Sequence, residues 1–204
     1  MLHERPTYAE AVVLKGGESI AVQWTCDSAY RFFPLIEHPD LGLTLHPFDS
    51  ATNKTLCLVG RAEVRDWVDV MDCHRLLQPL GYLIWAACGK DPSFNPTSIL
   101  DEARRSARYT QTELAELAFD GSVPDAADLA RNWKGMLEQA DEIVALLPPE
   151  QAGCCVLGAD LELYTGTGGA LAQELSQGEL TFHEGRIGGA WPRFLNRPPH
   201  RHGG

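Results

Sequence analysis

Apolar residues recur at intervals of three and four positions through residues 125–147, and this spacing is the strongest structural signal in the chain. The residues concerned are Leu129, Trp133, Met136, Ala140, Ile143 and Leu147. A stripe with this period covers one face of an α-helix, here of about six turns. Pro148 and Pro149 end the segment,. Because a helix with one long apolar face must bury that face, the spacing predicts a helical core.

Several segments before it also have helical features. Residues 47–60 begin with Asp49 as the predicted N-cap and end at a glycine,. Residues 62–77 carry apolar side chains on one face, and residues 96–108 have a proline in their first turn,. Residues 82–88 are almost entirely apolar, so we expect them to be buried.

The first 45 residues are β-rich instead. Two short apolar runs surround Gly16–Gly17, which predicts a hairpin, and residues 41–46 alternate apolar with small or polar residues,. Short apolar runs return after residue 150. We therefore predict an α+β fold, with a partial mixed sheet followed by a mainly helical C-terminal portion. Its three portions are residues 1–60 (the β-rich core and first motif helix), 61–150 (helical) and 151–204 (short strands and a tail).

The composition is that of a globular protein, with 44% apolar and 22% charged residues,. The net charge is −11, and residues 109–180 hold thirteen acids against two bases. This acidity argues against broad nonspecific binding of nucleic acid, which needs a basic surface. No apolar run approaches the ~20 residues that cross a bilayer, and no signal peptide precedes the hairpin. We therefore expect a cytoplasmic protein without a membrane partner.

The six cysteines do not form the paired spacing of a zinc site,. They lie mostly among apolar residues, which favours buried, reduced thiols. His46 and His74 flank the charged segment described next, and we expect both to be structural. Neither a serine-hydrolase elbow nor a His-Glu-x2-His zinc motif is present,.

The densest group of charged residues lies between positions 49 and 72. It comprises Asp49, Lys54, Arg61, Arg65, Asp66, Asp69 and Asp72. One interpretation is a solvated helix face with surface ion pairs, whose contribution to stability is small. The other is a charged groove between two consecutive helices. In that groove, lysine and arginine would hold the phosphates of a nucleotide, and carboxylates would orient them or assist a cation.

Two motifs in this segment resemble those of the nucleotidyltransferase toxins of the AbiEii/AbiGii type. Residues 48–61 read FDSATNKTLCLVGR, like the family's D-L-A-x-N-K motif and the helix that follows it, which ends in an arginine. Residues 65–69 read RDWVD, like the family's R-D-hydrophobic-hydrophobic-D motif. Ser50 stands where the family usually has leucine. The resemblance extends over roughly residues 8–150.

The resemblance implies a nucleotidyltransferase fold that transfers a nucleotide from a triphosphate to an RNA or protein acceptor. Carboxylate-held Mg²⁺ assists this transfer in the family, and several members are toxins paired with an antitoxin. Carried over to this chain, Lys54 would contact phosphate, and Arg61 and Arg65 would support the groove electrostatically. The positioning carboxylates would be Asp49, Asp66 and Asp69. Of these three, Asp69 is the one we expect to be catalytic.

The chain departs from the family where the metal should bind. No Gly-Ser followed by Asp-x-Asp occurs before Asp49, and the strand at residues 19–24 ends in Gln23 and Trp24 rather than in acids. Asp27 is therefore the best candidate metal ligand and a candidate catalytic residue. A two-metal mechanism would lack its main ligands. The chain is then either a truncated nucleotidyltransferase or a degenerate homologue kept as a non-catalytic binding protein.

A partial sheet should leave an edge or an apolar surface uncovered. We expect this surface to be covered by self-association into a homo-oligomer, by a partner, or by the C-terminal strands.

Overall fold

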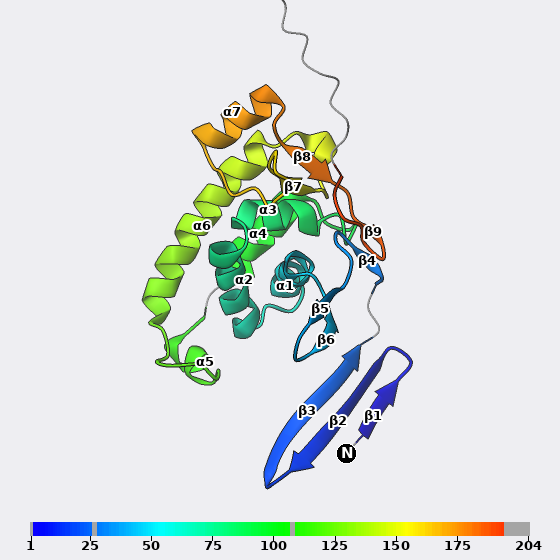
Figure 1. Ribbon diagram of the computed structural model, residues 1–204. Coiled ribbons are helices and arrows are strands. Elements are labelled where there is room, and N and C mark those ends of the chain that lie inside the picture. The colour runs from blue at the N-terminus through cyan, green and yellow to red at the C-terminus, as the bar shows by residue number, and fades with distance from the viewer. Residues whose placement is uncertain (1, 26–27, 107–108, 194–204) are drawn as a thin grey trace, which may run out of the picture.

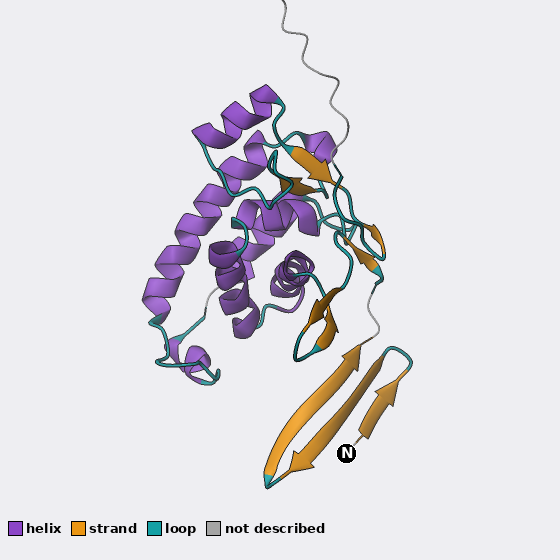
Figure 2. Ribbon diagram, in the orientation of Figure 1, coloured by secondary structure: helices purple, strands orange, loops and turns teal. Residues whose placement is uncertain are grey.

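The computed structural model describes residues 2–25, 28–106 and 109–193, which form helices and small antiparallel sheets (Figures 1 and 2). The fold class is α+β, as predicted. The helices are α1 (Pro47–Arg61), α2 (Val64–Leu76), α3 (Leu80–Ala87), α4 (Pro96–Ser106), α5 (Gln111–Ala115), α6 (Ala126–Leu146) and α7 (Gly169–Gln177). A 3-10 turn at Pro149–Gln151 follows α6. None of these helices is both long and apolar enough to cross a membrane.

Helix α3 is the centre of the helical body, with α1, α2, α4 and α6 around it (Figure 1). All eight of its residues are buried, as their apolar or small character predicts. Gly81 allows α6 to come close, because a Cβ at this position would lie only 2.7 Å from the Cβ of Ile143. The amphipathic α6 packs its predicted stripe here, with Trp133, Ala140 and Ile143 buried.

The strands form four separate antiparallel groups rather than one mixed sheet, so this part of the prediction is wrong for the described residues. The groups are β1–β2–β3 (Leu2–Arg5, Tyr8–Lys15, Glu18–Thr25), β4–β9 (Tyr30–Arg31, Arg186–Ile187), β5–β6 (Ile36–His38, Gly42–Thr44) and β7–β8 (Cys155–Leu157, Thr181–His183). Outside the first group the strands have two or three residues each. Such short strands make local pairs and cannot extend into a common sheet.

The N-terminal sheet has an uncovered apolar face. The predicted hairpin at Gly16–Gly17 forms, and its register places Val13 opposite Ile20 and Ala9 opposite Trp24 on one face,. Val13, Ile20 and Trp24 are 49%, 64% and 55% exposed. The described C-terminal strands pair elsewhere, β8 with β7 and β9 with β4, and these three side chains stay exposed. Covering by a second copy or by a partner stays a prediction.

Helix α1 begins differently from the prediction. Its N-cap is His46, whose Nδ1 accepts the backbone N–H of Phe48 at 3.3 Å. Asp49 lies inside the first turn instead, with its carboxylate directed to other partners described below. At the other end, Ala62 takes the left-handed conformation that terminates α1, at φ 52° and ψ 45°,.

Candidate functional site

The end of α1 and the start of α2 bring four of the predicted charged residues together. Lys54 Nζ lies 2.6 Å from Asp69 Oδ2 and 3.4 Å from Asp66 Oδ1. Arg61 donates two hydrogen bonds to the same Asp66, from Nε at 2.7 Å and from Nη2 at 2.9 Å. The turn at Ala62 makes this possible, because it folds the end of α1 back onto the first turns of α2. We call Lys54, Arg61, Asp66 and Asp69 the charged cluster.

Asp66 is the fixed centre of the charged cluster. Its side chain is fully buried, and a two-pronged Arg–carboxylate pair is among the strongest side-chain contacts,. Burial alone would raise the pKa of Asp66, but the hydrogen bonds and charges of Arg61 and Lys54 outweigh it and hold the pKa below its usual value. Asp66 is therefore ionised at neutral pH and holds both cations.

Lys54 and Asp69 are the accessible part of the cluster, with side chains 36% and 45% exposed. Burial lowers the pKa of Lys54, while the hydrogen bond and charge of Asp69 and the charge of Asp66 raise it, with a net increase. Lys54 is therefore fully charged at neutral pH. It also lies at the surface, where an incoming anion could reach it.

Arg65 lies beside the charged cluster and shares Glu63 with Arg61, whose Nε is 3.7 Å from Glu63 Oε1. The Nε of Arg65 pairs with Glu63 Oε2 at 2.7 Å. Counting this pair, three cations face three carboxylates, so the corner between α1 and α2 is close to electrically neutral. An anionic ligand would have to displace a carboxylate to bind here.

Asp49 is not part of the cluster, which corrects its predicted role in the groove. Its carboxylate is fully buried and accepts the backbone N–H groups of Phe32 at 2.9 Å and Phe33 at 3.0 Å. It also forms an ion pair with Lys90 at 2.9 Å. Its function in the described structure is to hold the loop before β5 onto α1.

Lys90 is the partner that the sequence analysis missed. Its side chain is 8% exposed, and Nζ also donates to the backbone oxygen of Asp49 at 3.1 Å and to Asn53 Oδ1 at 2.8 Å. The ammonium lies 5.7 Å from the centre of the Phe32 ring. One signal was present in the sequence: a lone lysine directly after a fully apolar segment needs an anionic partner if it is buried.

The described carboxylates do not fit a magnesium site. Mg²⁺ needs oxygen ligands free to coordinate it, whereas Asp49, Asp66 and Asp69 are each held by a lysine or arginine,. Among the residues that the structure describes, no group of three or more His, Cys, Asp or Glu side chains could hold a metal ion. The predicted metal ligand Asp27 lies outside the described residues.

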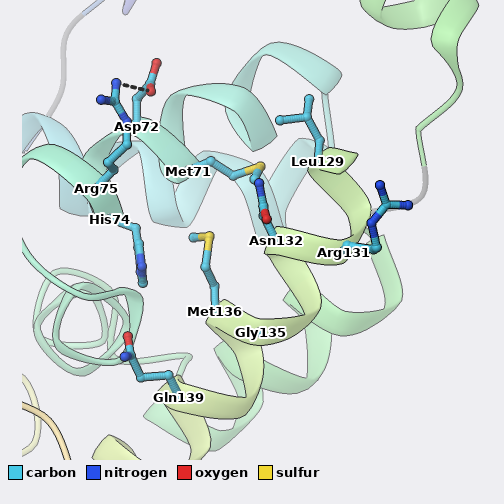
Figure 3. Close-up of a pocket in the computed structure, with 10 residues that line it drawn as sticks. All are labelled: Met71, Asp72, His74, Arg75, Leu129, Arg131, Asn132, Gly135, Met136 and Gln139. Carbon is cyan, nitrogen blue, oxygen red and sulfur yellow. Dashed lines mark hydrogen bonds and ion pairs between the residues drawn. The ribbon is translucent and has the colours of Figure 1, made fainter. Parts of the chain in front are cut away.

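A groove of 660 Å³ lies on another face of α2, between α2 and α6 (Figure 3). Met71 of α2 and Met136 of α6 line it, together with Asn132 and Gln139 of α6. His74 lines it and accepts the N–H of Leu80 through Nδ1 at 3.0 Å, and burial lowers the pKa of its imidazole. None of the charged cluster lines this groove.

The two histidines and three of the five described cysteines behave as expected, whereas Cys57 and Cys73 are only half-buried. His46 and His74 each accept a backbone N–H. The cysteines in the described part of the chain are free thiols, and Cys88, Cys154 and Cys155 are buried. Burial raises the pKa of Cys73, Cys88 and Cys154 to about 11. These three thiols are therefore protonated at neutral pH and are poor nucleophiles.

Comparison with known proteins gives no match: no family model, no curated protein and no solved structure is similar to this chain. The family resemblance therefore rests on the two sequence motifs alone.

Proposed function

We propose that this chain is a nucleotidyltransferase-like protein of the AbiEii/AbiGii type, in which Lys54 binds the phosphates of a nucleoside triphosphate. The observation that carries the proposal is the position of Lys54, which is charged and half-exposed between a fixed carboxylate and an accessible one. Lys54 belongs to the first motif, and Asp66 and Asp69 belong to the second. The residues that the two motifs single out are therefore in contact with one another. We propose an RNA or protein acceptor and a cognate antitoxin from the same resemblance, and a cytoplasmic location from the sequence pattern.

The arrangement divides the roles within the charged cluster. Arg61 and Asp66 form a rigid support, since the buried carboxylate has no alternative partner in solvent. Asp69 is different, because an exposed ion pair of this kind contributes only about 0–1 kcal/mol. A triphosphate carries more charge than one carboxylate, so it can take the place of Asp69 on Lys54. Asp69 is then free to orient the acceptor or the bound nucleotide.

The second candidate function is non-catalytic binding by the same fold. It is favoured by one observation, the pairing of each carboxylate near the site with a cation. In this case the charged cluster binds nucleotide without transferring it.

Isothermal titration calorimetry tests the phosphate site. We expect the wild type to bind a nucleoside triphosphate and Lys54→Ala to lose that binding. Lys134→Ala is the matched control, because Lys134 is also an exposed lysine beside a carboxylate, at 3.7 Å from Glu138, but on helix α6 and outside the charged cluster. Absence of binding by the wild type, or equal binding by Lys54→Ala, would rule out the proposal.

Asp69→Asn separates the two candidate functions. If Asp69 only competes with phosphate, the variant binds the triphosphate more tightly both with and without Mg²⁺. If Asp69 assists a cation or the transfer, the variant binds less tightly in the presence of Mg²⁺ and loses label transfer from radiolabelled triphosphate to RNA or protein.

A further inference from the structure

A separate cavity of 240 Å³ lies on the side of the molecule where the N-terminus of α1 meets the C-terminal segment. Four stretches of chain that are far apart in sequence contribute to it: Phe33, His46, the turn at residues 157–163, and Trp191 with Pro192. It shares no residue with the charged cluster or with the groove between α2 and α6. Its lining combines aromatic rings with carboxylates.

Two aromatic rings form adjoining walls of this cavity. The His46 ring stacks on Phe33, with ring centroids 4.2 Å apart and planes at 27°. The Trp191 ring lies 6.0 Å from the His46 ring, with the two planes at 81°. Trp191 is 56% exposed, so most of its indole surface remains open to a ligand. Rings at right angles around a cavity can contact one group from two sides.

The imidazole wall is uncharged at neutral pH. Burial lowers the pKa of His46, although the charges of Asp49 and Glu162 oppose this effect. Its Nδ1 accepts the N–H of Phe48, so the neutral ring carries its proton on Nε2,. The aromatic lining therefore presents no positive charge that would repel a cation.

The acidic residues of the lining are Asp160 and Glu162, on either side of Leu161. Leu161 has a φ of 66°, a conformation that residues other than glycine rarely adopt,. Asp160 accepts the N–H of Glu162 through Oδ1 at 3.0 Å. Within the part of the chain that the structure describes, no lysine, arginine or histidine lies within ion-pair distance of either carboxylate. Among the described residues, the cavity therefore has negative charge that no ion pair neutralises.

We propose that this cavity binds a methylated ammonium group, carried either by a free quaternary amine or by a trimethylated lysine side chain. Aromatic faces attract cations, tryptophan most strongly, and the two carboxylates supply the counter-charge. Methylation favours binding because Leu157, Leu163 and Pro192 also line the cavity. These apolar residues contact methyl groups well, whereas a bare ammonium would lose the hydration of any N–H donor that faces them.

Calorimetry with choline tests the charge requirement directly. Its neutral isostere, 3,3-dimethyl-1-butanol, has the same shape without the charge. We expect choline to bind and the alcohol to bind at least about tenfold more weakly, the ratio produced by about 1.4 kcal/mol. A peptide with trimethyl-lysine, compared with the same peptide carrying unmodified lysine, tests the second source of the group. If choline binds more tightly than the trimethyl-lysine peptide, the ligand is a free quaternary amine. If the trimethyl-lysine peptide binds more tightly than choline, the ligand is a methylated protein.

Variants place the ligand in this cavity. Trp191→Ala should weaken binding by about tenfold or more, and Trp191→Phe should weaken it less. Glu162→Gln should also weaken binding. Because Glu162 is exposed, this substitution should leave the fold intact, so weaker binding would reflect the lost charge. Trp24→Phe is the matched control, since Trp24 is exposed to the same degree on the N-terminal sheet. Equal binding of choline and the alcohol, unchanged binding by Trp191→Ala, or no binding of choline and of the modified peptide would overturn the proposal.

Discussion

Replacing Asp49 by alanine should destabilise the fold more than any other single charge removal near the two motifs. The substitution removes the acceptor for the N–H groups of Phe32 and Phe33 and leaves Lys90 buried without its carboxylate. An unpaired buried donor costs about 1–3 kcal/mol, and breaking a buried ion pair costs about 3–5 kcal/mol. Because these terms overlap, we expect a loss of about 3–5 kcal/mol in the free energy of unfolding.

The assay is urea unfolding monitored by circular dichroism. The dependence of the free energy of unfolding on urea concentration is compared between variants. Asp49→Asn keeps one oxygen acceptor and should lose less stability than Asp49→Ala. Asp72→Ala is the surface control: Asp72 pairs with Arg75 at 3.0 Å, but both side chains are more than half exposed. Its expected effect is within about 0.5 kcal/mol. If Asp49→Ala costs no more than Asp72→Ala, the assignment of Asp49 as a buried structural anchor is wrong.

Three further variants test other parts of the structure. The pKa of Asp66 is below its usual value, so the ionised side chain stabilises the fold above the ordinary aspartate pKa of about 3.9, and this stability is lost as the pH falls through the lower folded pKa,. Asp66→Asn should therefore flatten the decline of the urea midpoint over that acidic range. An unchanged decline would contradict the assignment. Ala62→Gly should raise the free energy of unfolding by about 0.5–1 kcal/mol, because Ala62 holds a left-handed conformation that suits glycine,; a lower thermal midpoint would show that this turn is not strained. Ile20→Lys places a charge on the exposed apolar face of the N-terminal sheet and should reduce the mass measured by light scattering if copies associate there,; a wild-type protein that stays monomeric at high concentration would contradict self-association.

The helices could be predicted because their signals are local. The apolar period of residues 125–147 and the apolar run at residues 82–88 correspond to α6 and α3. The start of α5 likewise depends on a local contact, the capping box between Thr110 and Glu113. The strand arrangement was harder to predict, because pairs such as β4 with β9 join residues about 155 positions apart. No local pattern specifies such a pairing.

The candidate site was predicted in part for the same reason. Asp66 and Asp69 are three positions apart on one helix, so Lys54 can contact both,. Asp49 and Lys54 are five positions apart, which is about 140° around a helix, and their side chains point in different directions. The Asp49–Lys90 pair joins α1 to the segment after α3, a contact that depends on how the helices pack. The aromatic cavity at Trp191 is likewise visible only once the chain is folded.

The most direct test of the central claim is a residue-resolved NMR titration of the ¹⁵N-labelled protein with a nucleoside triphosphate. We predict amide shift changes concentrated around Lys54 and Asp69, with little change at Phe32, Phe33 and Lys90, because the Asp49 anchor does not contact phosphate. In Lys54→Ala the changes at Asp69 should disappear. Shift changes confined to the groove between α2 and α6, or none at all, would contradict a phosphate site at Lys54.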